Sequence, residues 1–375
     1  MSDRDFVRAL PRWSSLRGRR LYRIHLDPLL LGTLLLIMAF GLVVLYSALE
    51  RNIEVFDGQV IRLGFALVVL IVAAQFDPRF YLRWSPALYA LGVVLLVAVL
   101  VAGVIVKGSQ RWLEIPGLPR FQPSEIMKLA VPLTVAWYLN DRPLPPRFLH
   151  LVVALAITAV PAALIAVQPD LGTAILVAAG GLAVVALSGI YWRWIGLAGL
   201  VAALAAPGLW MVMRDYQRER VLTLFDPERD PLGSGWNIIQ STTAIGSGGV
   251  FGKGLLQGTQ SHLEFLPESQ TDFIIAVVGE EFGLIGVVLL LIMYLVVLAR
   301  GLHIATEARH TYGRLVAGAF TLTFFVYVFV NIGMVSGLLP VVGVPLPLVS
   351  YGGTSAITLL ASFGIMMSIH THRGW

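Results

Sequence analysis

Residues 28–49 read PLLLGTLLLIMAFGLVVLYSAL, an apolar run without one charged side chain. A helix needs roughly 20 mostly apolar residues to cross a bilayer, so this run predicts a membrane-spanning helix. It is too long for the apolar core of a signal peptide and lacks a small-residue cleavage site. We therefore expect it to be kept as a first span.

The same pattern recurs along the chain and predicts an all-α polytopic membrane protein with about ten transmembrane helices. Hydrophobic residues make up 57% of the sequence and charged residues 13%, whereas an ordinary soluble domain carries about a quarter charged residues. We expect residues 1–375 to form a single transmembrane domain. The candidate spans are 28–49, 59–76, 85–106, 123–140, 149–167, 171–190, 194–213, 273–299, 315–337 and 346–369.

Arginine is unevenly distributed between the alternating loops, which predicts the orientation in the membrane. Placing the tail 1–27 in the cytoplasm puts most arginines inside, while the short outer loops hold only Arg51, Lys107, Arg111 and Arg120. Both termini are then cytoplasmic, and residues 214–271 form a long periplasmic loop between the seventh and eighth spans. This layout also explains the net charge of +5 without nucleic acid as a partner.

Two classes of chemistry are excluded by composition and spacing. Cysteine is absent, which removes disulfides, cysteine nucleophiles and thiolate metal sites. The glycine run around Gly252-Lys253 fails the P-loop test, because Ser247 stands where glycine is needed and Gly254 where serine or threonine is needed. A flexible, amide-rich loop near anionic lipid is the interpretation left open for this run.

Charged side chains within the spans are candidate functional groups, because burying them in a membrane is costly. Glu125 and Lys128 are three residues apart, so they share one helix face. An internal ion pair at a helix start is the alternative explanation for these two charges. Asp170 breaks an apolar run and needs a cationic partner or water. Lys128 is the only lysine in any candidate span, so we predict a Lys128–Asp170 pair that holds helices in register or shapes a polar cavity. Arg62 is expected to reach the interface.

Asp272 is a carboxylate at the expected outer boundary of the eighth span, followed by an apolar stretch. Low local dielectric raises the pKa of such a carboxylate and suits it to general-base work. From position alone, Thr271 or Asp272 as an ordinary helix N-cap is the simpler explanation. Arginines 214, 218 and 220, with Arg111 and Lys107, make the outer face basic. An anionic substrate such as a lipid pyrophosphate would explain them, and so would surface solvation.

Several of these segments together resemble the SEDS family of cell-wall membrane proteins, and the resemblance covers nearly the whole chain. Residues 337–353, rich in proline and glycine, are expected to form a re-entrant or broken-helix segment. The runs 341–345 and 264–268 resemble the RodA-type branch of the family. The motifs that carry the resemblance are residues 107–113, 121–128, 168–173, 239–249, 265–281 and 340–353.

The resemblance implies a peptidoglycan glycosyltransferase that polymerises lipid II at the outer face of a bacterial inner membrane during elongation, with a class B penicillin-binding protein as partner. The family's essential aspartate falls on Asp272, and its buried Lys and Asp pair on Lys128 and Asp170. Ser269 and Gln270 depart from the basic residues usual there. A divalent cation, Mg or Mn, is possible, with Asp272 as base or metal ligand. A lipid II flippase is the main alternative, and an inactive scaffold the third. We expect substrate-binding roles for Arg111, Glu125, Lys128, Asp170, Arg220, Glu268 and Thr271.

Overall fold

The computed structural model describes residues 24–49, 52–106, 109–114, 120–213, 215–230, 233–262 and 268–372, and these are almost wholly helical. Two short strands form an antiparallel hairpin at one end of the bundle. The elements in chain order are α2 (Pro28–Ala48), α3 (Ile53–Gln75), α4 (Pro78–Ala102), β1 (Val104–Val106), β2 (Ser109–Trp112), α5 (Pro123–Asn140), α6 (Phe148–Val167), α7 (Leu171–Leu187), α8 (Trp192–Val212), α9 (Asp215–Phe225), η1 (Pro227–Arg229), α10 (Ser234–Gly248), α11 (Thr259–His262), α12 (Ile274–Glu307), α13 (Thr311–Val335) and α14 (Gly353–Thr371).

Each of the ten predicted spans overlaps one of these helices, which confirms the all-α membrane class. Within the described residues, seven helices are long and apolar enough to cross a membrane, and α7 is apolar but shorter. The total of ten crossings stays a prediction. The tenth predicted span began too early, because α14 starts only at Gly353, after an irregular stretch that contains Pro345 and Pro347.

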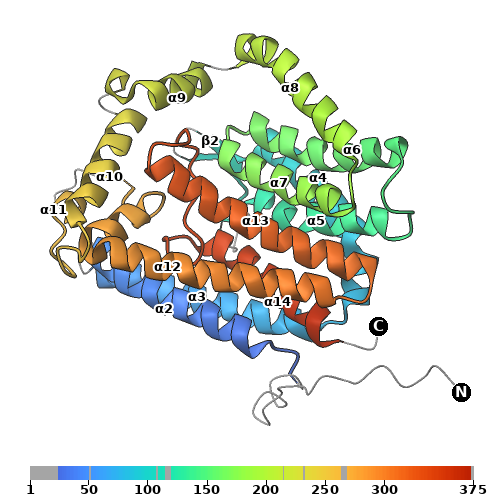
Figure 1. Ribbon diagram of the computed structural model, residues 1–375, viewed down its shortest axis with the longest axis horizontal. Coiled ribbons are helices and arrows are strands. Elements are labelled where there is room, and N and C mark those ends of the chain that lie inside the picture. The colour runs from blue at the N-terminus through green and yellow to red at the C-terminus, as the bar shows by residue number, and fades with distance from the viewer. Residues whose placement is uncertain are drawn as a thin grey trace, which may run out of the picture.

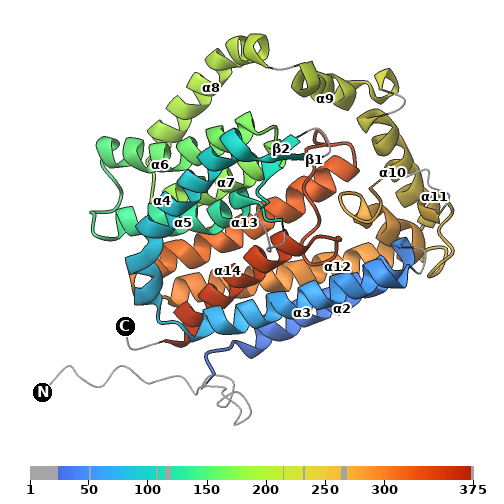
Figure 2. The same cartoon turned by 180° about the vertical axis from the view of Figure 1, so that it is seen from behind.

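Helix α13 forms the centre of the bundle (Figures 1 and 2). Of its most apolar stretch 72% is buried inside the protein, against 22% for α3. It packs against α12 on one side and against α5 and α7 on the other, while α14 packs against α3. The side chains on α13 are therefore the ones best placed to meet residues from both halves of the bundle.

Both ends of the described chain lie at the same end of the bundle (Figure 1) and are bonded to each other through α12. Arg300 of α12 donates to the buried carboxylate of Asp27, the N-cap of α2, at 2.5 Å and 3.2 Å. His370 of α14 lies 3.1 Å from the Arg300 guanidinium. Burial acts to raise the pKa of Asp27, but the bonds from Arg300 and from the Leu30 amide outweigh it and hold that pKa below its ordinary value.

The predicted long loop 214–271 has more regular structure than expected, because its described part contains α9, η1, α10 and α11. We call this part the outer segment. With α8 it forms an arch beside the bundle, and most described side chains of α8 are exposed (Figures 1 and 2). The outer segment returns to the bundle through α10, which packs along α12.

The loop after α10 is held by two buried glutamates of α12. Oε1 of Glu280 accepts hydrogen bonds from Lys253 Nζ and the Thr259 and Gln260 amides, at 2.7, 2.8 and 2.9 Å. Oε1 of Glu281 accepts from the Leu256 amide at 3.1 Å. Within the glycine run itself, the amides of Gly252, Lys253 and Gly254 donate to backbone carbonyls, two of them on α12, so these amides are bonded within the protein. Lipid binding by this loop stays a prediction.

We expect Gly248→Ala to destabilise the fold by about 1–3 kcal/mol, because the contact between α10 and α12 leaves no room for a side chain. A Cβ at Gly248 would lie 2.0 Å from the carbonyl oxygen of Gly279, a backbone atom that cannot rotate away. Gly246→Ala is the matched control, since nothing lies within 4 Å of a Cβ on that residue of the same helix. Thermal unfolding in detergent, followed by tryptophan fluorescence, measures the difference. Equal melting temperatures for the two variants would contradict this packing.

Candidate functional site

The turn 268–273 carries the predicted catalytic carboxylate to the amino end of α12. Helix α12 begins at Ile274 with Phe273 as its N-cap, and no side chain caps it. The prediction that Thr271 or Asp272 caps this helix is therefore wrong. Thr271 instead donates its hydroxyl to Oε2 of Glu268 at 2.9 Å and its amide to the Glu268 carbonyl at 3.0 Å, so its hydrogen bonds point back into the turn.

The backbone of this turn is held from the far end of the chain. The carbonyl of Gln270 accepts from the Tyr351 amide at 2.8 Å, and that of Thr271 accepts from the Ser350 hydroxyl at 2.5 Å. The carbonyl of Asp272 accepts from the side-chain amide of Asn331 at 2.8 Å. Three consecutive carbonyls are thus bonded to residues between 331 and 351, which fixes the turn against α13 and the loop that follows it.

The loop 336–352 between α13 and α14 has no regular secondary structure, as the proline and glycine content predicted. Gly343 and Leu348 both have positive φ angles, of 73° and 62°. A positive φ is costly for a residue with a side chain, and such strain is found mostly where the surrounding structure fixes it. A Cβ on Gly343 would lie 3.4 Å from Oδ2 of Asp272. The carboxylate of Asp272, half-buried, therefore lies against this loop.

A second group of polar side chains is buried between α5, α13 and α14. Lys128 donates to Oε1 of Glu125 at 2.6 Å and to the hydroxyl of Tyr327 at 2.5 Å. The hydroxyl of Thr358 donates to the other carboxylate oxygen of Glu125 at 2.8 Å. Both charged side chains are 8% exposed. The interpretation of Glu125 and Lys128 as an internal ion pair at a helix start is thereby confirmed.

The predicted Lys128–Asp170 pair is wrong, because each of the two residues has another partner. Asp170 lies 3.5 Å from the guanidinium of Arg111 on β2. It also accepts a 2.6 Å hydrogen bond from the side-chain amide of Gln122 and caps α7 by accepting from the Thr173 amide. The strand β2 thus brings an arginine from the hairpin to a carboxylate that the spans alone did not satisfy.

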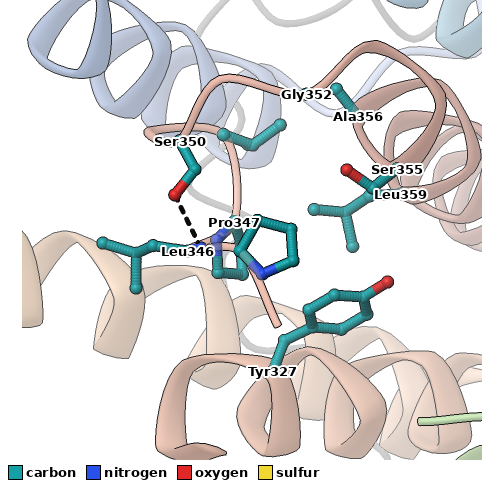
Figure 3. A pocket seen from close by; sticks show the side chains of 10 residues that line it. Tyr327, Leu346, Pro347, Ser350, Gly352, Ser355, Ala356 and Leu359 are labelled. Atoms are coloured by element: carbon teal, nitrogen blue, oxygen red, sulfur yellow. Dashed lines mark hydrogen bonds between the residues drawn. The ribbon is translucent and has the colours of Figure 1, made fainter. Parts of the chain in front are cut away.

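A small pocket lies between the loop 345–352 and the helices α13 and α14 (Figure 3). Figure 3 shows the Tyr327 ring at one side of it, opposite Ser355 and Leu359 of α14. The hydroxyl of Tyr327 is the one bonded to Lys128. Tyr327 therefore joins the pocket to the buried ion pair, while the loop joins it to the turn that carries Asp272.

Of the predicted site residues, the structure groups Glu268, Thr271 and Asp272 in one turn, Glu125 with Lys128, and Arg111 with Asp170. Arg220 lies on α9, whose neighbours are η1 and α10. It belongs to the outer segment. Arg62, expected to reach the interface, is exposed, with its guanidinium 5.0 Å from the centre of the Tyr351 ring. Within the described ranges, no group of three or more His, Asp or Glu side chains is placed to hold a metal ion.

Five residues of these networks were not predicted as site residues from the sequence: Gln122, Tyr327, Asn331, Ser350 and Thr358. All are uncharged, so the search for charged groups within spans passed over them. Asn331 could have been found, because a side-chain amide within an apolar span also needs hydrogen-bond partners. The others are ordinary residues for a helix end or a loop and give no comparable signal.

The fold and these networks together define a polytopic membrane protein with ion pairs and hydrogen-bonded polar groups buried within its helical bundle. Comparison with known sequences makes this class specific. The chain belongs to the FtsW/RodA/SpoVE family of cell cycle proteins, whose model matches residues 27–374.

Similar proteins agree with that family. The peptidoglycan glycosyltransferase MrdB of Escherichia coli (strain K12) is 54% identical over 94% of this chain and 95% of its own. Stage V sporulation protein E of Bacillus subtilis (strain 168) is 35% identical over 92% of this chain and 96% of its own.

Solved structures show the same fold. A chain of a peptidoglycan synthase complex, described as coordinating polymerization and crosslinking, is 33% identical with a TM-score of 0.82, over 93% of this chain and 98% of its own. The rod shape determining protein RodA of Thermus thermophilus is 29% identical with a TM-score of 0.71, over the same shares of the two chains.

Proposed function

We propose that this protein is a peptidoglycan glycosyltransferase that polymerises lipid II into glycan strands during cell elongation. The observation that carries the proposal is the placement of Asp272. Its carboxylate stands at the amino end of a long apolar helix, on a turn whose three carbonyls are held by the loop and helix behind it. The 54% identity to MrdB over almost the full length of both chains supports the same function and an elongation role.

The reaction joins an acceptor sugar hydroxyl to an anomeric carbon and releases a lipid pyrophosphate. The hydroxyl is a poor nucleophile, so a base that takes its proton during attack speeds the step. In our proposal Asp272 is that base, in a single displacement that inverts the anomeric centre. The alternative role for Asp272 is to ligate a divalent cation, Mg or Mn, which would help to neutralise the pyrophosphate.

The leaving pyrophosphate needs positive charge beside it. We propose Arg111 and Arg220 for that work, with Glu125, Lys128, Asp170, Glu268 and Thr271 shaping the substrate site around them. The side chain of Arg111 is one-third exposed while it pairs with Asp170, which supports a place for it beside the substrate. Asp170 then orients Arg111 for its task.

The membrane location follows from the apolar helices and the family, and the finer topology is part of our proposal. We place both termini in the cytoplasm and the outer segment in the periplasm of the bacterial inner membrane. The arginine distribution and the position of both described ends at one end of the bundle support this. We propose a class B penicillin-binding protein as partner, supported by the likeness to a chain of a peptidoglycan synthase complex.

The test is polymerisation of purified lipid II by the purified protein, alone and with its partner. We expect glycan strands that a muramidase cuts to disaccharide units. A flippase would instead move fluorescent lipid II between the leaflets of liposomes without forming strands. Transport without polymerisation, in a preparation that binds its partner, would overturn the proposal in favour of the flippase. A scaffold would do neither.

A further inference from the structure

Asn331 lies on α13 and is wholly buried, with a side chain that reaches two segments at once. Its amide nitrogen donates to the carbonyl of Asp272 at 2.8 Å and to the carbonyl of Val344 at 2.7 Å. Both partners are acceptors, so the nitrogen and not the oxygen of the amide must face them. Asn331 therefore ties the residue that carries the carboxylate to the loop that lies against that carboxylate.

The other polar atom of Asn331 indicates what the residue contributes. Its Oδ1 is buried and has no hydrogen-bond partner among the described residues. A buried acceptor without a partner destabilises a fold. The presence of the amide is thus explained better by what its nitrogen holds than by a net gain in stability.

Asn331 differs from the other two groups that hold the turn. Ser350 and Tyr351, which bond the carbonyls of Thr271 and Gln270, both belong to the irregular loop. Asn331 stands on the central helix of the bundle, most of whose side chains are buried. It alone of the three donors relates the position of Asp272 to a rigid element.

We propose that Asn331 is a positioning residue for the glycosyl transfer, which sets the place of the Asp272 carboxylate relative to the bundle. The inference rests on the proposed function, since it assigns a role to Asp272. Asn331 does not itself touch the reacting atoms in this proposal. Its loss lets the turn 268–273 move relative to α13, and a base displaced by about 1 Å can cost a hundredfold in rate.

The experiment compares Asn331→Ala and Asn331→Asp with Thr323→Val in the complex with the partner. Thr323 is buried on the same helix, but among the described residues its hydroxyl bonds only to the Ala319 carbonyl of its own helix. We expect kcat to fall about 100-fold in both Asn331 variants, with KM for lipid II within about threefold of wild type. Asn331→Asp should not rescue the rate, because it places a second oxygen against two carbonyls. Thr323→Val should keep a kcat near that of wild type.

A second arm separates positioning from stability. In an Asp272→Asn background, Asn331→Ala should lower the residual rate no further, because there is no base left to misplace. A purely structural residue would lower the melting temperature and the folded fraction, yet leave kcat per folded molecule unchanged in both backgrounds. That result would overturn the inference. Failure of wild type to polymerise lipid II would overturn the proposed function instead, so the two failures are distinguishable.

Discussion

Replacing Asp272 by asparagine is expected to slow the polymerisation of lipid II by about 100- to 10,000-fold, the contribution typical of a positioned general base. Asparagine has nearly the same shape as aspartate but cannot accept the hydroxyl proton. The hydrogen bond from Asn331 reaches the backbone carbonyl of residue 272 and survives the change. The fold should therefore be kept while the chemistry is lost, and the melting temperature should stay near that of wild type.

Glu228→Gln is the matched control for this loss of one negative charge. Glu228 is an exposed carboxylate of η1 in the outer segment. Its removal should leave the rate of polymerisation within about twofold of wild type, since isolated surface charges contribute little. A rate for Asp272→Asn above one-tenth of wild type would remove Asp272 from the catalytic role. A rate restored by excess Mn over Mg would point to the alternative role as a metal ligand.

Lys128→Met is expected to destabilise the protein by about 3–5 kcal/mol, because it leaves Glu125 as a buried charge without its cation. The pair is 8% exposed at both partners, so solvent screens it little. Thr358 remains as a hydrogen-bond donor to Glu125 but brings no positive charge. The same variant should impair polymerisation, because the buried group around Tyr327 adjoins the pocket beside the loop. Denaturant unfolding in detergent, followed by tryptophan fluorescence, gives the stability.

Two further variants make this prediction specific to the buried pair. Adding Glu125→Gln to Lys128→Met should recover most of the lost stability, since neither buried group is then charged. Arg120→Met removes the cation of the exposed pair with Glu114, where the side chains are 53% and 49% exposed. That change should cost no more than about 1 kcal/mol. A Lys128→Met protein as stable as Arg120→Met would refute the energetic role of the pair.

The helical class and the approximate place of each helix in the chain could be predicted from the sequence, because the length of an apolar run reflects the thickness of the bilayer. The ends of the helices could not. The predicted last span, which started at residue 346, ran through Pro347 and through Leu348, whose positive φ does not fit a right-handed helix. The long loop 214–271 also contains more helix than predicted. Its helices are polar, and the length of apolar runs does not reveal polar helices.

The residues of the site were largely found by their charge, but their partners were not. Glu125 and Lys128 are close in the chain, so helical spacing predicted their contact. Asp170 and Arg111 are brought together only by the hairpin β1–β2, and a sequence shows no register between distant segments. Lys128 was chosen for Asp170 because it is the only lysine in any candidate span, and that choice left out Arg111, which lies outside the spans.

The break at Gly283 has a mechanical consequence for the reaction centre. Helix α12 is interrupted there by a residue with φ of 64° and ψ of −162°, where the backbone of Gly252 comes too close for any side chain. The short piece before the break is fastened to the outer segment through Glu280 and Glu281. Asp272 therefore lies at the free end of a short helical piece whose other end is bonded to the outer segment. In the function proposed above, a protein that binds the outer segment would therefore shift the proposed base, Asp272, without touching the substrate.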